Sequence, residues 1–252
     1  MSSIKEYLFD IQNERAEEWI RERLSDEQLD EDSDEWRQLA SEYSNHQDHL
    51  LEEAEWESEL KWLKENGSSN IHRFFVGELN ALKTMAESNL GHATKMAFML
   101  HSNIVVKMSY AYAVTLLESF LGDTLKALIT EREDFLHNAI RNIEEVSKAK
   151  YSLAELAETN LSICNLALKH ATEILFHNIP KVKKVYEQVL GVNLQLDISK
   201  VSKITALRHD IVHRNGYSKD NEPINLNAQD LYQAIEDIRE FTSSLQKQIN
   251  AL

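Results

Sequence analysis

The chain has 252 residues but only six glycines and two prolines, a shortage of turn residues that argues against a β-sheet protein and favours long helices. Apolar residues make up 42% of it, enough to build a core, which excludes disorder of the whole chain. The net charge of −15 is uneven, because residues 1–66 contain 21 acidic and 7 basic side chains, whereas residues 67–252 contain 21 and 20. This charge disfavours nucleic-acid binding by residues 1–66, but not by residues 67–252.

The first quarter of the sequence predicts two helices and a linker. Residues 4–24 carry apolar side chains near one helical face, and the acidic, uneven stretch 25–34 reads as a linker. A second helix is expected over 34–65, where apolar positions drift at near-helical spacing. Asn-Gly-Ser-Ser at 66–69 is a break, and it ends an acidic helical N-terminal region that we place at residues 1–66.

The remainder, residues 67–252, also reads as helical, so the predicted fold is an all-α bundle with an acidic helical extension before it. Gly91 marks a kink or an end in the first of these helices. The expected helices cover residues 70–100, 103–130, 133–149, 152–177, 180–191, 199–215 and 227–250.

Several helix ends can be assigned from single residues. Pro180 is expected to open a short helix that Gly191 closes, because proline fits the first turn and glycine the residue after the last. The helix that starts at 199 should end at Gly216. Asn227 is a suitable N-cap for the last helix.

Cysteine content and hydropathy predict a cytoplasmic protein with no membrane partner. Cys164 is the one cysteine, so no internal disulfide can form, and no basic stretch followed by an apolar run opens the sequence. The most apolar stretches, around 96–100 and 110–117, are interrupted by polar residues and fall short of the ~20 residues that a membrane helix needs. We interpret them as core.

The segment most informative about function is Arg-His-Asp-Ile-Val-His-Arg-Asn-Gly at 208–216. It gathers cations, imidazoles, a carboxylate and an amide at one helix end. An imidazole exchanges protons near pH 7, and a permanent cation stabilises a phosphorane. Phosphoryl chemistry on RNA requires this combination.

Helical geometry orients the side chains of this segment. At about 100° per residue, Ile204, Leu207 and Ile211 form an apolar stripe. Arg208 lies at the edge of that stripe, and His213 lies roughly opposite Ile204, away from the core. Because a long arginine side chain can still reach toward the histidine side, the sequence predicts a helix end with an exposed imidazole beside a permanent cation.

The spacing of Arg208 and His213, with four residues between them, resembles the motif of the HEPN superfamily. In that motif an arginine is followed, after four to six residues, by a histidine, and a polar residue often follows the arginine directly. His209 is that polar residue here. The helix at 103–130, with Glu118, and the closing helix at 227–250 are similar to HEPN helices, so the resemblance covers about residues 100–250.

The resemblance implies a dimeric, metal-independent endoribonuclease with no cofactor, as in toxins and abortive-infection proteins. Arg208 would stabilise the phosphate in the transition state. His213 would transfer the proton during attack by the ribose 2′-hydroxyl or departure of the 5′-oxygen. Supporting roles would fall to His209, Asp210, Asn215 and Glu118. The partners implied are an RNA substrate, a second copy of the chain, and an antitoxin or regulatory protein.

Two other readings remain open. His209 and His213, four residues apart, could bind zinc beside Asp210, although no third ligand is evident. Alternatively, the bundle is a non-catalytic module that binds a nucleotide, RNA or a protein. Weak candidates for contacts to an RNA backbone are Lys181, Lys183, Lys184 and Arg214.

The acidic residues 1–66 have two interpretations. A solvated helical extension that supports the dimer is one, and a charged segment that shields the cleft or holds an antitoxin is the other.

Overall fold

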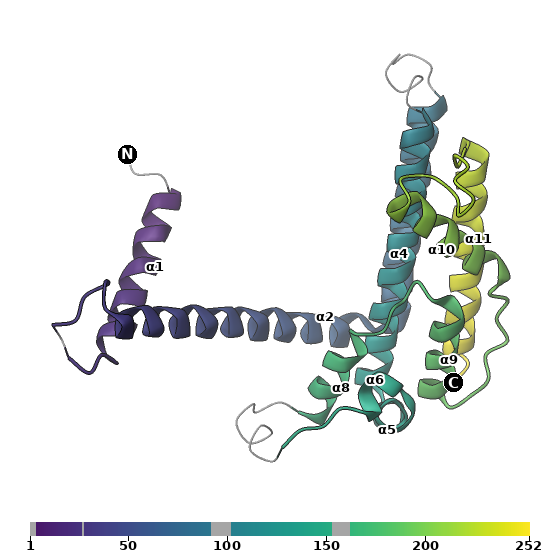
Figure 1. Cartoon of the computed structure of the whole chain (residues 1–252). Coiled ribbons are helices and arrows are strands. Elements are labelled where there is room, and N and C mark those ends of the chain that lie inside the picture. The colour runs from purple at the N-terminus through teal and green to yellow at the C-terminus, as the bar shows by residue number, and fades with distance from the viewer. Residues whose placement is uncertain (1–3, 27, 92–101, 153–161) are drawn as a thin grey trace. The chain divides into compact units, whose positions relative to one another are not determined.

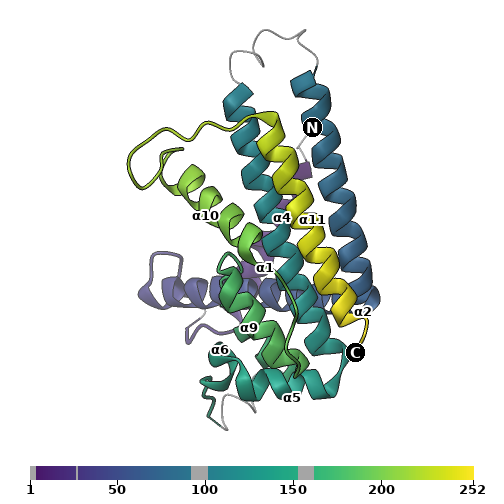
Figure 2. The ribbon, with the colours of Figure 1, turned by 90° about the vertical axis from the view of Figure 1, so that its right-hand side faces the viewer.

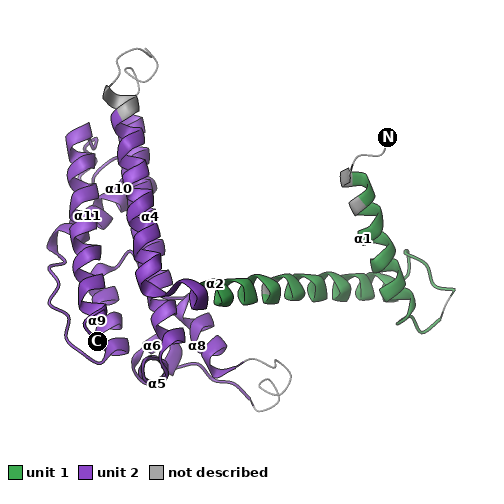
Figure 3. Ribbon diagram, turned by 180° about the vertical axis from the view of Figure 1, so that it is seen from behind, with its two compact units in different colours: residues 1–62 green, residues 63–252 purple. Residues whose placement is uncertain are grey.

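A computed structural model of the chain describes residues 4–26, 28–91, 102–152 and 162–252 (Figure 1). Helix accounts for 77% of it, and the described residues contain no strand, only an isolated bridge between Tyr217 and Pro223. The all-α prediction is therefore confirmed. The chain divides into two compact units, Met1–Trp62 and Leu63–Leu252 (Figure 3).

Unit 1 consists of α1 (Ile4–Arg21) and the first part of α2 (Asp34–Gly91). Aromatic contacts join the two helices: the rings of Trp19 and Tyr43 are 5.5 Å apart, and the Arg21 guanidinium lies 5.2 Å from the Trp36 ring centroid. The amide and hydroxyl of Ser25 both donate to Glu35, at 2.7 and 2.6 Å, and they lower the pKa of that carboxyl. Trp19 of α1 therefore packs against α2 within unit 1.

The break expected at 66–69 is a single non-helical residue inside α2. Gly67 has φ 63° and ψ 172°, and the helix resumes at the next residue. Glu131 explains the immediate restart, since its Oε1 accepts a hydrogen bond of 2.9 Å from the Ser68 amide, as an N-cap does. A Cβ at position 67 would lie 2.6 Å from that oxygen, so glycine is required on grounds of space as well as φ.

Unit 2 is built around the longest helix that lies wholly within it, α4. Leu117, Leu121 and Leu125 of α4 are fully buried, and α4 contacts each of the helices α5, α8, α9, α10 and α11. Figure 2 shows α10 lying obliquely beside α4 and α11. After α2, the helices of this unit are α4 (Ser102–Glu131), α5 (Glu133–Asn142), α6 (Glu144–Ser147), α8 (Ile163–Ala171), α9 (Ile179–Leu190), α10 (Ser199–His213) and α11 (Ala228–Ile249).

Two predicted helices are shorter than expected. The helix predicted over 133–149 is interrupted at Ile143, which has extended φ and ψ and is fully buried, so core packing outweighs helix continuity there. Among the described residues, α8 is the part of the helix predicted over 152–177, and Ile174 is buried after the end of α8. Residues 92–101 and 153–161, the other parts of predicted helices, lie outside the described residues.

The predicted helix ends at 180, 191 and 227 are confirmed. Pro180 occupies the first turn of α9, and Gly191 closes α9 at φ 71°. Asn227 forms a capping box with Asp230: its side chain accepts from the backbone amides of Gln229 and Asp230, and its own amide donates to the Asp230 carboxylate.

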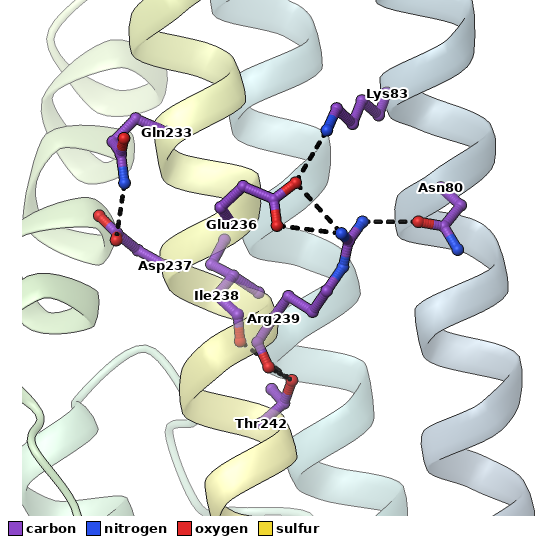
Figure 4. A network of polar contacts seen from close by, with 8 residues as sticks. All are labelled: Asn80, Lys83, Gln233, Glu236, Asp237, Ile238, Arg239 and Thr242. Atoms are coloured by element: carbon purple, nitrogen blue, oxygen red, sulfur yellow. Dashed lines mark hydrogen bonds and ion pairs between the residues drawn. The ribbon is translucent and has the colours of Figure 1, made fainter.

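Polar contacts fasten α11 and α9 to the rest of unit 2. Figure 4 shows Glu236 of α11 accepting from Lys83 of α2 at 2.8 Å and from Arg239, whose guanidinium also reaches Asn80. Inside the core, the Tyr186 hydroxyl of α9 donates to the Leu121 carbonyl at 2.7 Å.

By length and composition, Asn103–Glu131 could cross a membrane, with a mean hydropathy of 1.4 in its most apolar window. The prediction that no stretch of that length occurs is therefore wrong, because scattered polar residues leave the average high. A helix at the core of a globular domain passes the same test, and α4 has the contacts of such a helix.

Candidate functional site

The motif of residues 208–216 lies at the C-terminal end of α10, where α10 meets α4. The buried residues of α10 are Val201, Ile204 and Thr205, whereas Leu207 and Ile211, expected in the apolar stripe, are half-buried. Arg208 follows Ile204 by one helical turn, so it continues the buried face toward α4.

Arg208 meets Glu118 of α4. Their charged groups are 3.9 Å apart, between Arg208 Nη2 and Glu118 Oε2, and each side chain is 22% exposed. Arg208 Nε and Glu118 Oε1 are buried and have no hydrogen-bond partner among the residues that the structure describes. The pair is thus loose, and both groups retain hydrogen-bonding capacity for a ligand.

His213 does not join Arg208. The two residues are five apart, about 140° around the helix. Instead the rings of His209 and His213 lie 4.8 Å apart, at an interplanar angle of 43°, and both residues are exposed. Within one chain, the predicted catalytic arginine and histidine face different directions.

Asp210 and Arg214 form a second ion pair on the far side of α10. Arg214 Nε lies 3.0 Å from Asp210 Oδ1, and the carboxylate side chain is 15% exposed. This pairing partly neutralises Arg214, one of the weak candidates for contacts to RNA. Asp210 is thereby engaged with its own helix rather than with Arg208.

Asn215, not Gly216, ends the helix, so the predicted role of Gly216 at this end is wrong. Asn215 is left-handed, with φ 55°, directly after the cap residue Arg214. The Gly216 amide donates to the Ile211 carbonyl at 3.1 Å, which makes this end a Schellman motif with asparagine in the usual glycine position. The left-handed backbone at this helix end therefore explains why an asparagine occupies position 215.

Lys107 of α4 is a cation that the sequence analysis did not include in this site. A Cβ at Gly216 would lie 2.8 Å from Lys107 Nζ and 3.6 Å from its Cε. The signal in the sequence was the spacing from Glu118, because eleven residues are three helical turns and place both side chains on one face of α4.

Two of the three lysines proposed to flank an RNA backbone, Lys181 and Lys183, are committed to ion pairs. Lys181 pairs with Glu145. Burial alone would raise the pKa of the Glu145 carboxyl, but the Lys181 ammonium outweighs burial and the pKa is lowered. Lys183 lies 2.8 Å from Glu187 and is the main reason for the lowered pKa of that carboxyl. Lys184 adds to the low pKa of Glu144, to which Lys148 contributes most.

The described residues contain no group of three or more histidine, cysteine, aspartate or glutamate side chains placed to hold a metal ion. His209 and His213 thus lack a third ligand from this part of the chain. Comparison of the chain with models of protein families, with curated proteins and with solved structures finds no match.

Proposed function

We propose that this protein is a metal-independent endoribonuclease of the HEPN superfamily, acting through Arg208 and His213. The observation that carries the proposal is the arrangement at the end of α10. A partly buried arginine, whose Nε has no hydrogen-bond partner among the described residues, is held against α4, and two imidazoles in tilted contact stand exposed on another face of the same helix end. A fixed cation and a group that titrates near neutral pH are the two requirements for cleaving a phosphodiester without a metal.

In this mechanism His213 accepts the proton of the ribose 2′-hydroxyl or returns a proton to the departing 5′-oxygen. Arg208 stabilises the charge that develops on the phosphate oxygens. The 2′-oxygen forms a bond to phosphorus as the bond to the 5′-oxygen breaks, so the products are a 2′,3′-cyclic phosphate and a 5′-hydroxyl. His209, whose ring lies 4.8 Å from that of His213 in a tilted contact, is the supporting residue beside it.

The active form in this proposal is a homodimer. Arg208 and His213 are about 140° apart on α10, so two copies are needed to bring an arginine and a histidine face to face. An exposed apolar stripe on α4, formed by Ile104, Met108 and Tyr112, supports this arrangement. These residues follow one another at every helical turn, and their face adjoins that of Glu118.

We place such an enzyme in the cytosol, among toxins and anti-phage proteins. In this proposal the enzyme is regulated through its acidic N-terminal region, residues 1–66, whose surface holds a regulatory protein. Deletion of these residues is expected to raise the cleavage rate if they shield the site.

The experiment that tests the proposal is incubation of the purified chain with total tRNA and a long single-stranded RNA in EDTA. The site variant is R208A/H213A. The matched control is H137A/R141A, which removes an exposed histidine and arginine four residues apart on α5. Cleavage by the parent and the control alone, leaving cyclic phosphate ends, supports the proposal. Equal cleavage by all three proteins assigns the activity elsewhere.

The second candidate function is a non-catalytic module that binds a nucleotide, RNA or a partner protein. The ion pairs of Lys181, Lys183 and Arg214 favour it, because they reduce the positive charge available to a long RNA. Binding of RNA by the pure protein with no cleavage, under the conditions above, would select this candidate.

A further inference from the structure

Lys107 and Glu118 mark the two ends of the contact between α4 and the motif on α10. The eleven residues between them correspond to about 16 Å of helix, with both side chains on one face. Glu118 meets Arg208 at one end, and Lys107 meets Gly216 at the other. Lys107 is therefore a neighbour of the site but stands apart from the phosphate that Arg208 would hold.

The position of the Lys107 side chain is set by a well-fixed backbone. Gly216 is buried and has φ 80°, its amide donates to the Ile211 carbonyl, and its carbonyl accepts from the Ile224 amide at 2.8 Å. The lysine stem lies so close that any Cβ at position 216 would collide with Nζ. The absence of a side chain at 216 thus lets the ammonium rest on the loop that follows α10.

The Lys107 ammonium has no compensating charge in the part of the chain that is described. It forms neither an ion pair nor a hydrogen bond there, whereas Lys126, on the same helix, lies 3.9 Å from Asp123. Lys107 is half-buried, and its three ammonium donors have no partner among the described residues, so they and the positive charge are both available to an incoming anion.

We infer that Lys107, which lies beside Gly216 at the end of α10, binds a phosphate of the RNA backbone further along the strand from the scissile one. This rests on the proposed function, which supplies the RNA and the scissile position at Arg208 and His213. Lys107 is then a residue that positions the strand. It contributes to binding of the RNA, not to proton transfer.

The test measures binding of a single-stranded 2′-O-methyl RNA, which cannot be cut by 2′-hydroxyl attack, across a salt series. The proteins are the full chain, K107Q, K107R and the control K169Q, which removes an exposed lysine on α8. K107Q is expected to bind roughly fivefold more weakly, and the slope of log affinity against log salt should shrink by about 0.7. K107R and K169Q should keep the parent slope.

The same variants are then assayed for cleavage of unmodified RNA, where K107Q should raise KM and leave kcat near that of the parent. A structural role, such as balancing the dipole of α10, would lower the melting temperature of K107Q and leave the salt slope unchanged, which overturns the inference. Binding of a 5′-mononucleotide that depends on Lys107, with no such dependence for RNA, overturns it too.

The outcomes separate the two proposals. If the parent cleaves RNA and K107Q has the same salt dependence of binding and the same KM, the proposed nuclease is supported and the role of Lys107 is overturned. If the parent binds RNA without cleaving it and the salt dependence of binding is shallower for K107Q, the proposed nuclease is overturned, while Lys107 remains a phosphate-binding residue. If the parent neither binds nor cleaves RNA, both are overturned.

Discussion

Arg208 of α10 faces Glu118 of α4 with 3.9 Å between the charged atoms, and this pair joins the motif helix to the central helix of unit 2. The distance is long for a hydrogen bond, and both side chains are 22% exposed, so the interaction is weaker than a fully buried ion pair. Its effect on stability can be separated from the role of Arg208 in cleavage.

A double-mutant cycle with E118Q, R208Q and the combined variant should give a coupling energy of about 0.5–1 kcal/mol in the free energy of unfolding. The measurement is chemical denaturation at pH 7. Because R208Q also removes the proposed phosphate ligand, its loss of cleavage should far exceed this coupling. A coupling near zero would mean that Glu118 does not hold Arg208 in solution.

The hydroxyl of Tyr186 is the polar anchor of α9 in the core. It is fully buried, donates to the Leu121 carbonyl, and has a pKa raised well above its ordinary value by burial. Y186F should lower the free energy of unfolding by about 1–2 kcal/mol, because the carbonyl loses this donor. Y7F, at an exposed tyrosine of α1, should change it by less than about 0.5 kcal/mol. Equal effects of the two substitutions would contradict the assignment.

Gly67 and Gly77 lie in the same helix but should respond in opposite directions to alanine. G67A places a Cβ at φ 63° and 2.6 Å from the Glu131 carboxylate, so it should cost about 1–3 kcal/mol through strain and loss of the cap on Ser68. G77A meets nothing within 4 Å and should stabilise by about 0.5–1 kcal/mol, as expected of helix interiors. Thermal unfolding of both variants measures this difference in sign.

His72 predicts a dependence of stability on pH. Burial lowers its pKa below 6.5, and its ring packs 5.6 Å from Phe120 and 6.5 Å from Phe75. Below pH 6.5 the unfolded chain binds a proton that the folded chain does not, so stability falls as the pH falls from 6.5 toward the folded-state pKa. H72F keeps the aromatic contacts and should lose less stability over this range.

The control for this experiment is H137F, at an exposed histidine of α5, whose pH profile should match that of the parent. Unfolding is followed in denaturant at several pH values between about 5 and 7, across the window that the lowered pKa defines. A parallel profile for H72F and the parent would show that His72 contributes nothing to the dependence.

The exposed stripe on α4 predicts where the dimer forms. M108D puts a charge at a methionine that is 67% exposed in one chain, and it should shift the protein toward monomer and reduce cleavage in parallel. M85D, at a methionine of α2 that is 61% exposed, is the matched control. Sedimentation equilibrium and the RNA assay measure the two effects. A dimer that survives M108D would locate the interface elsewhere.

Local signals in the sequence determined the class of fold and the helix ends at particular residues. The spacing of apolar residues over 103–130 predicted both ends of α4 to within one residue. Apolar residues three or four apart are needed wherever a helix packs against a neighbour, so the pattern extends as far as the packed helix does. Pro180, Gly191 and Asn227 act through the backbone of their own turn, so their roles could be assigned without knowledge of the surroundings.

Tertiary structure decided what each polar group meets. Ile143 breaks a helix because the core takes its side chain, and Gly67 causes only a kink because Glu131, distant in sequence, caps the next turn. Lys181 and Lys183 are neutralised by carboxylates, while Lys107 of α4 lies beside Gly216, which follows α10, and forms no ion pair among the described residues. Helical periodicity is a local property, whereas ion pairing and close approach depend on which helices pack together.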